Sequence, residues 1–248
     1  MENVAEMKNG FDMAYTEEIE ERLTKCGYAI NHVIINAADY GVPQRRRRAF
    51  FLAVLKGGKP FPPPLTHSVE ANEGDLLIAD SHITVWDAIG DLPSVKHGEG
   101  EEYTAFAAKP QNAFQGRMRK NLKRVRNHIA RRLQLKQFER LSSLKPGQGL
   151  KDLPKHLQTK GGYSGAYGRL TKEMIAPTIT RWVFHPGSGR WGHPVDIRTL
   201  TIRETARIQG FYDSFEFIGT FVDQAGQLGN AVPPLLAEKI AVELKRFL

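Results

Sequence analysis

Residues 28–55, YAINHVIINAADYGVPQRRRRAFFLAVL, hold two apolar stretches separated by a polar turn and four consecutive arginines. The first stretch, residues 28–35, and the second, residues 49–55, have the length and composition of β-strands. The second is almost continuously apolar, which is typical of a strand buried on both faces in a parallel sheet covered by helices. The pattern predicts an α/β fold.

The flanking segments supply the helices that such a sheet needs. Residues 11–26 predict an amphipathic helix, because apolar side chains recur every four positions, and Gly27 marks its end. Residues 84–89 predict a short helix. Helical periodicity returns over residues 201–208 and 234–248.

Composition also divides the chain. Proline and glycine are dense over residues 56–68, which predicts a connection leaving the sheet. From there to about residue 195, apolar runs are short and interrupted by polar residues, which predicts a smaller second domain of loops and short elements. We therefore expect a first domain over residues 1–75, a second over residues 76–225, and a helix over residues 226–248 that returns to the first.

Several classes of protein are excluded by composition. No apolar run approaches the roughly 18 residues of a membrane-spanning helix. The first residues include Glu2 and Glu6 and lack the apolar stretch of a signal peptide. The single cysteine, Cys26, excludes an internal disulfide framework and fits a reducing compartment. We expect a cytoplasmic protein of prokaryotic or phage type.

The net charge of +8 is concentrated in one segment. Residues 116–140 contain ten lysines and arginines against one acid, Glu139, which leaves 25 basic and 26 acidic residues elsewhere. Such a patch predicts a polyanion partner and favours nucleic acid over the alternative of a solvated helix face, because such a face would carry balancing acids. No cysteines or spaced histidines accompany His128, so we expect no metal site. The candidate phosphate contacts are Lys123, Arg124, Arg131 and Arg132.

Four motifs then occur in a fixed order. They are ENV at residues 2–4, QRRRR at residues 44–48, IRTLTIRETARIQGF at residues 197–211 and QLGNAVPP at residues 227–234. Together they resemble the DNA cytosine-5 methyltransferase family, and the resemblance runs the length of the chain. Members of that family flip a cytosine out of the duplex, add a cysteine thiolate to C6 and methylate C5 from S-adenosylmethionine.

The resemblance implies a catalytic role for three side chains. Glu2 would hydrogen-bond N3 of the base and share a proton with it. Arg48 would stabilise charge developing toward O2, with Arg46 helping to hold the site. Because alternate side chains of a strand point to opposite faces, Arg46 and Arg48 would share the face toward the base. For Arg45 and Arg47 we expect the alternative, a simple basic cluster on the other face.

The other motifs imply binding and support. By resemblance, the turn with Asn230, Ala231 and Val232 lies against S-adenosylmethionine; by residue type alone, its glycine and asparagine indicate a turn and a helix N-cap. Both interpretations stay open. The resemblance places Thr178, Thr180 and Arg181 at DNA phosphates. It also makes double-stranded DNA the polyanion partner, and Arg198, Arg203 and Glu204 structural supports. We interpret His128 as a residue of the recognition domain, and His185 and His193 as structural residues or main-chain contacts.

Two features of the family are missing. The chain has no Pro-Cys dipeptide for the nucleophile, and no glycine-rich loop follows its first strand, since residues 161–168 come too late. The resemblance therefore implies a C-terminal half: the last strands and returning helix of a Rossmann-like methyltransferase sheet, plus a smaller, irregular, β-rich target-recognition domain. S-adenosylmethionine would be bound mainly by an N-terminal half or subunit, without which the chain would be inactive. The alternatives are a DNA-binding module without chemistry and a decayed remnant.

Overall fold

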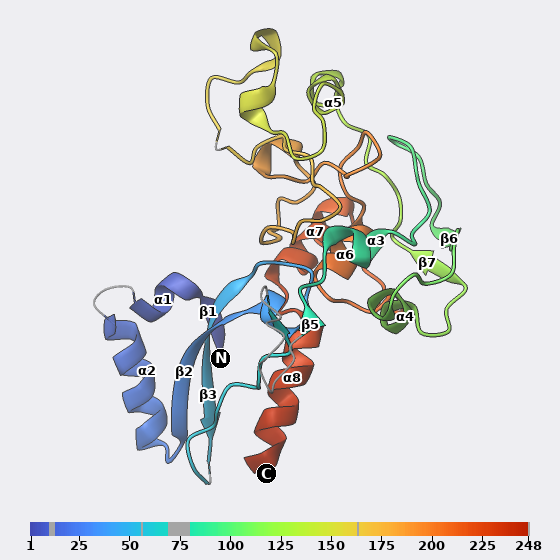
Figure 1. Cartoon of the computed structure of the whole chain (residues 1–248). Helices are drawn as coiled ribbons and strands as arrows, with labels where there is room; N and C mark the ends of the chain where they lie inside the picture. Colours follow the sequence, from blue (N-terminus) through green and yellow to red (C-terminus); the bar gives the residue numbers. More distant parts are fainter. Residues whose placement is uncertain (10–12, 56, 69–79, 163, 248) are drawn as a thin grey trace. The chain divides into compact units, whose positions relative to one another are not determined.

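The chain divides into two compact units (Figure 1). Unit 1 comprises Met1–His82 and Val232–Leu248, and unit 2 comprises Ile83–Ala231. The first predicted domain boundary, after residue 75, lies outside the described residues, and the second, after residue 225, lies within a helix. The computed structural model describes the whole chain except residues 10–12, 56, 69–79, 163 and 248.

Unit 1 is built on a three-stranded sheet. Its order is β1 (Glu2–Val4), β3 (Arg47–Val54), β2 (Ala29–Asn36), with β3 antiparallel to both neighbours. The prediction of a parallel sheet is therefore wrong for the described strands. Only a short connection with the 3-10 helix Ala37–Tyr40 separates β2 from β3, so β3 runs back along β2. As the middle strand with helices on both sides, β3 has the continuous apolar run that parallel strands also show.

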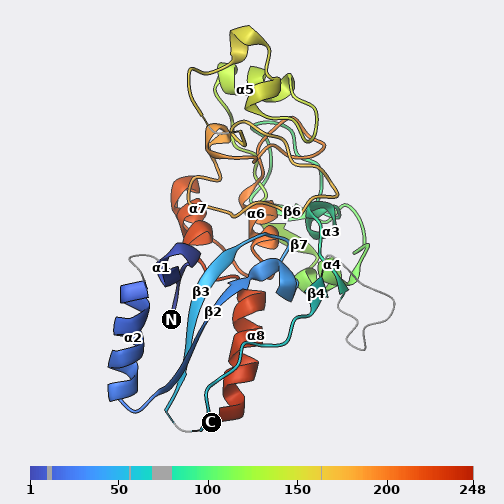
Figure 2. The ribbon, with the colours of Figure 1, turned by 60° about the vertical axis from the view of Figure 1, so that its left-hand side comes forward.

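Helices cover both faces of this sheet (Figures 1 and 2). On one face lie α1 (Ala5–Asn9) and α2 (Ala14–Lys25), whose Ile19 and Leu23 pack against a cluster that includes Phe51. On the other lies α8 (Pro234–Leu244), where the predicted C-terminal helix ends before a 3-10 turn. The predicted start of the first helix, at residues 11–12, lies outside the described residues.

The two edges of the sheet differ. Met1 and Phe51 exchange both main-chain hydrogen bonds, each at 2.9 Å, so the peptide groups of the next residue, Glu2, point away from β3. No described strand pairs with that outer side of β1. At the opposite edge, Asn31 of β2 donates to the Pro60 carbonyl at 3.0 Å. Unit 1 also contains a two-residue parallel pair, β4 (His67–Ser68) with β5 (Asp80–Ser81).

Unit 2 consists of short helices and long loops. Its described strands are β6 (Tyr103–Ala105) and β7 (Arg124–Arg126), an antiparallel pair. Unit 2 is the larger of the two units, and its described strands are few and short. The prediction of a smaller, β-rich second domain is therefore wrong. Buried side chains replace strand ladders there: Arg169 donates to several loop carbonyls, including Leu144 at 3.0 Å. The helices are α3 (Val85–Ile89), α4 (Ala113–Arg119), α5 (Leu135–Ser142), α6 (Ile202–Ile208) and α7 (Phe221–Asn230).

Candidate active site and nucleic-acid surface

The register of the sheet brings Glu2 and Arg48 together. Glu2 pairs with Phe50, two residues beyond Arg48, so both charged side chains lie on one face. Arg48 Nε lies 3.2 Å from Glu2 Oε1, and the side chains are 18% and 23% exposed. This contact is an ion pair without hydrogen-bond geometry, and Glu2 Oε1 accepts no hydrogen bond from any described residue. The site therefore holds a buried carboxylate oxygen whose hydrogen-bonding capacity no described residue uses.

Arg46 adds a second cation beside this pair. It is 3% exposed, and burial, reinforced by the Arg48 charge and opposed by Glu2, lowers its pKa to about 10. It therefore stays charged at neutral pH. Arg45 and Arg47 are exposed, whereas Arg46 is buried and Arg48 is half-buried, which is the predicted alternation, although β3 begins only at Arg47.

The sole cysteine lies at the other end of the sheet. Cys26 is exposed and follows α2, three residues before β2 begins. At that end Ala29 pairs with Val54, whereas Arg48 pairs with Ile35, six residues further along β2. At about 3.4 Å per residue, this separation is about 20 Å. Cys26 is therefore not part of the Glu2–Arg48 site.

In unit 2, α7 contacts the loop that holds the predicted phosphate-binding residues. A Cβ placed on Gly229 would lie 2.2 Å from Arg181 N and 2.5 Å from Thr180 C, so the main chains touch where only glycine fits. Thr180 and Arg181 are exposed and Thr178 is half-buried. The QLGNAVPP motif and the predicted phosphate-binding loop, about fifty residues apart in the sequence, are thus in main-chain contact.

The predicted cofactor-binding residues, Asn230, Ala231 and Val232, come directly after Gly229 in the chain. The helix α7 extends through Gly226 and Gly229, its last residue is Asn230, and Ala231 is its C-cap. The interpretation of Asn230 as an N-cap is therefore wrong. Ala231 donates to the Leu228 carbonyl at 3.3 Å and accepts from Gln209 Nε2 at 2.9 Å. The described residues at this turn offer the exposed Asn230 amide, and Ala231 has both main-chain groups bonded. That set does not make a complete S-adenosylmethionine site.

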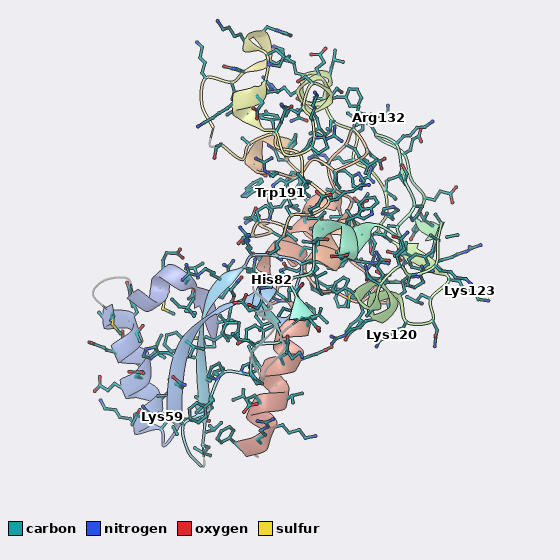
Figure 3. The ribbon with its side chains drawn as sticks, viewed as in Figure 1. Lys59, His82, Lys120, Lys123, Arg132 and Trp191 are labelled. Atoms are coloured by element: carbon teal, nitrogen blue, oxygen red, sulfur yellow. The ribbon has the colours of Figure 1, made fainter. Side chains whose placement is uncertain are left out.

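The basic segment separates into exposed and internally bonded residues. Lys123, Arg124 and Arg132 are exposed, and Figure 3 shows Lys123 and Arg132 on the surface of unit 2. Arg131 instead donates to the Phe184 carbonyl at 3.0 Å and lies 5.0 Å from the Phe184 ring centroid. Three of the four predicted phosphate contacts are thus available to a polyanion.

Family comparison now identifies the chain. The model of the C-5 cytosine-specific DNA methylases matches residues 1–246. The chain belongs to that family. Type II methyltransferase M.DdeI of Desulfomicrobium norvegicum is 32% identical over 268 aligned residues, which cover 100% of this chain and 62% of M.DdeI. Type II methyltransferase M1.HphI of Haemophilus parahaemolyticus is 33% identical, covering 97% of this chain and 54% of its own length. The chain thus spans about three fifths of these relatives.

A solved structure shares the methylase fold. It is a DNA modification methyltransferase encoded within an E. coli prophage, with a TM-score of 0.71 and 24% identity over 99% of this chain and 68% of that protein. In this methylase chain, no described helix has the length and apolar character needed to cross a bilayer. No group of three or more potential metal ligands occurs among the residues that the structure describes.

Helix α6 of the methylase carries a buried ionic network. Arg198 forms two 2.8 Å hydrogen bonds with Glu204, and Arg207 forms bonds of 2.9 and 2.7 Å with Asp213. The Arg198 charge holds the pKa of Glu204 well below its usual range despite burial. Arg203 is fully buried and donates to main-chain carbonyls. These contacts suit the structural role predicted for Arg198, Arg203 and Glu204.

The buried histidines belong to the same network. His128 Nε2 donates to the Pro93 carbonyl at 2.7 Å, and Nδ1 lies 3.0 Å from Thr201 Oγ1. His193 Nδ1 accepts from two main-chain amides, and burial lowers its pKa to about 4. Asp91 and Asp213, the acids that pair with Arg207, were not identified from the sequence. Asp91 lies 116 residues before Arg207, and Asp213 lies in the turn after α6, outside the helical periodicity.

Proposed function

We propose that this chain is the base-binding and target-recognition part of a DNA cytosine-5 methyltransferase, acting on a cytosine flipped out of double-stranded DNA. The observation that carries the proposal is the Glu2–Arg48 pair at 3.2 Å on one face of the sheet. A carboxyl group with one oxygen that accepts no hydrogen bond, held beside a guanidinium, can donate to N3 of a cytosine when protonated, while the guanidinium faces O2.

Each group in this site has a defined task. The protonated Glu2 carboxyl donates a hydrogen bond to N3 and transfers that proton as a nucleophile adds to C6, so that negative charge does not accumulate on the ring. Arg48 donates toward O2, where part of that charge appears. The buried Arg46 adds a second positive charge beside this pair.

The nucleophile and most of the cofactor site come from an N-terminal portion, in the same polypeptide or in a partner subunit. Three observations support this. The sequence has no Pro-Cys dipeptide, the end of β2 nearest Cys26 lies about 20 Å from the position that pairs with Arg48, and the outer edge of β1 has no described partner. A strand added there would lie next to Glu2. S-adenosylmethionine would bind that portion, with Asn230, Ala231 and Val232 touching it.

DNA binds the exposed surface of unit 2 under this proposal. Lys123, Arg124 and Arg132 contact phosphates through charge, and Thr178, Thr180 and Arg181 contact them from the loop against α7. The internally bonded Arg131 holds the Phe184 segment in place. Phosphate contacts of this kind position the protein, and base-edge contacts elsewhere specify the sequence.

Fusion to an N-terminal portion tests the proposal. The part of M.DdeI outside the match is joined ahead of this chain, and transfer of a labelled methyl group to DNA is measured for the fusion and for the chain alone. We expect transfer by the fusion only. Transfer by the chain alone, or none by a folded fusion that binds DNA, would overturn the proposal.

A further inference from the structure

An open aromatic face lies next to the predicted phosphate-binding loop. Trp182 is 52% exposed and directly follows Thr180 and Arg181. The Arg181 guanidinium carbon lies 5.3 Å from the centroid of the Trp182 ring. An exposed aromatic ring with an arginine beside it is the arrangement on which proteins stack single bases.

The ring is held in place by its surroundings. The Trp182 amide donates to Thr180 Oγ1 at 3.3 Å, and its carbonyl accepts from Ser188 Oγ at 2.5 Å. The indole lies 5.8 Å from the ring of the buried Phe184, centroid to centroid. Behind the loop, Gly229 of α7 contacts the main chain. A ligand would therefore meet a ring that is already positioned.

Another exposed aromatic in unit 2 provides a contrast. Tyr103 is 49% exposed and also lies beneath an arginine, Arg126. That arginine is neutralised by ion pairs with Glu102 and Glu216. No ion pair joins Arg181 to a carboxylate within the described part of the chain. Its charge is therefore available to an anion on the same side as an open ring.

We propose that Trp182 and Arg181 form a nucleotide-stacking site. Trp182 stacks on the face of a base that has lost a stacking neighbour, and Arg181 binds the adjoining phosphate. Base faces are closed within an intact duplex, and flipping a cytosine opens them, so this inference rests on the proposed function. Stacking on an aromatic side chain, with an arginine at the backbone, is how proteins hold unstacked bases of any sequence.

Binding of the full chain to two duplexes tests the site. One duplex is intact, and the other carries a single abasic position, which exposes base faces. We expect Trp182→Ala to reduce the affinity for the abasic duplex by about 5- to 150-fold, the range for loss of one stacked base. Its affinity for the intact duplex should change less than about twofold by the same reasoning. Trp182→Phe should retain most of the preference. Leu135→Ala, at another exposed apolar residue of unit 2, should leave both affinities unchanged.

A second measurement covers loss of folding. 2-Aminopurine beside the abasic position reports stacking through its fluorescence, which the wild-type chain should quench and Trp182→Ala should not. Equal losses on both duplexes, or quenching that survives in Trp182→Ala, would overturn the stacking site. If the fusion still methylates DNA in that case, the proposed function stands without it. If the wild-type chain binds neither duplex, both proposals are wrong.

Discussion

Two glycines of α7 allow a matched test of how this helix supports the DNA-binding loop. Gly226 and Gly229 lie three residues apart in the same helix. A Cβ on Gly226 would meet nothing within 4 Å. A Cβ on Gly229 would lie 2.2, 2.5 and 2.7 Å from three main-chain atoms of Thr180 and Arg181, which cannot rotate away as a side-chain terminus can.

The two alanine substitutions should therefore have opposite effects. Gly226→Ala should stabilise the protein by up to about 1 kcal/mol, the difference in helix propensity between glycine and alanine. Gly229→Ala gains less at the helix end and forces apart main chains already in contact. Overpacking of this kind costs about 1–3 kcal/mol, so the two variants should differ by at least about that amount.

Urea unfolding of both variants measures this difference. We also expect Gly229→Ala to weaken DNA binding, because its methyl group displaces Thr180 and Arg181, whereas Gly226→Ala should bind as the wild type does. Equal stability of the two variants would refute the close contact. Unchanged DNA affinity in a destabilised Gly229→Ala would show that this loop does not contact DNA.

Two further predictions concern buried and exposed charge in unit 2. The pKa of His193 is about 4 in the folded chain and near 6.5 in the unfolded chain, so the unfolded chain binds a proton at higher pH. The neutral, buried His193 therefore stabilises the fold fully above pH 6.5, and this contribution is lost as the pH falls toward 4. His193→Asn keeps an acceptor for the two amides and should reduce the slope of unfolding free energy against pH in that window by up to about 1.4 kcal/mol per unit; the exposed His156→Asn is the control, and an unaltered slope would contradict the assignment. Neutralising Lys123 and Arg124 to glutamine should weaken binding to cognate and random duplexes alike and flatten the logarithmic salt dependence by about 0.9 per lost phosphate contact. Arg131→Gln should instead lower stability, because the Arg131 side chain donates to the Phe184 carbonyl. If the salt slopes of Lys123→Gln, Arg124→Gln and Arg131→Gln are all equal, the surface with Lys123 and Arg124 faces something other than DNA.

Much of the local structure could be predicted from the sequence. Apolar runs located β2 and β3 to within two residues, and the periodicity ending at Gly27 located the end of α2, where Gly27 has the left-handed φ of 84°. Thr201 begins α6 as a capping residue, three positions before Glu204. These features depend on neighbours in the chain, which a sequence displays.

Strand direction and long-range contacts could not be predicted in the same way. A run buried on both faces has the same composition in a parallel and an antiparallel sheet, so β3 was assigned the wrong pairing. Phe184, which accepts from Arg131, and Asp91, which pairs with Arg207, lie 53 and 116 residues away, and only the fold brings them together. The alternation from Arg45 to Arg48 was predictable because extended chain leading into a strand already turns alternate side chains to opposite sides.

The central claim is that Glu2 acts on the base during methyl transfer. In the fusion with the N-terminal portion, Glu2→Gln should reduce the single-turnover rate of methyl transfer by about 10²–10⁴-fold, the usual contribution of a general acid. Glu6→Gln, an equal change of charge at an exposed position of α1, is the control. DNA affinity should be the same for the wild type and both variants. If Glu2→Gln instead loses DNA affinity while its single-turnover rate is unchanged, Glu2 is a structural residue and the account of this site is wrong.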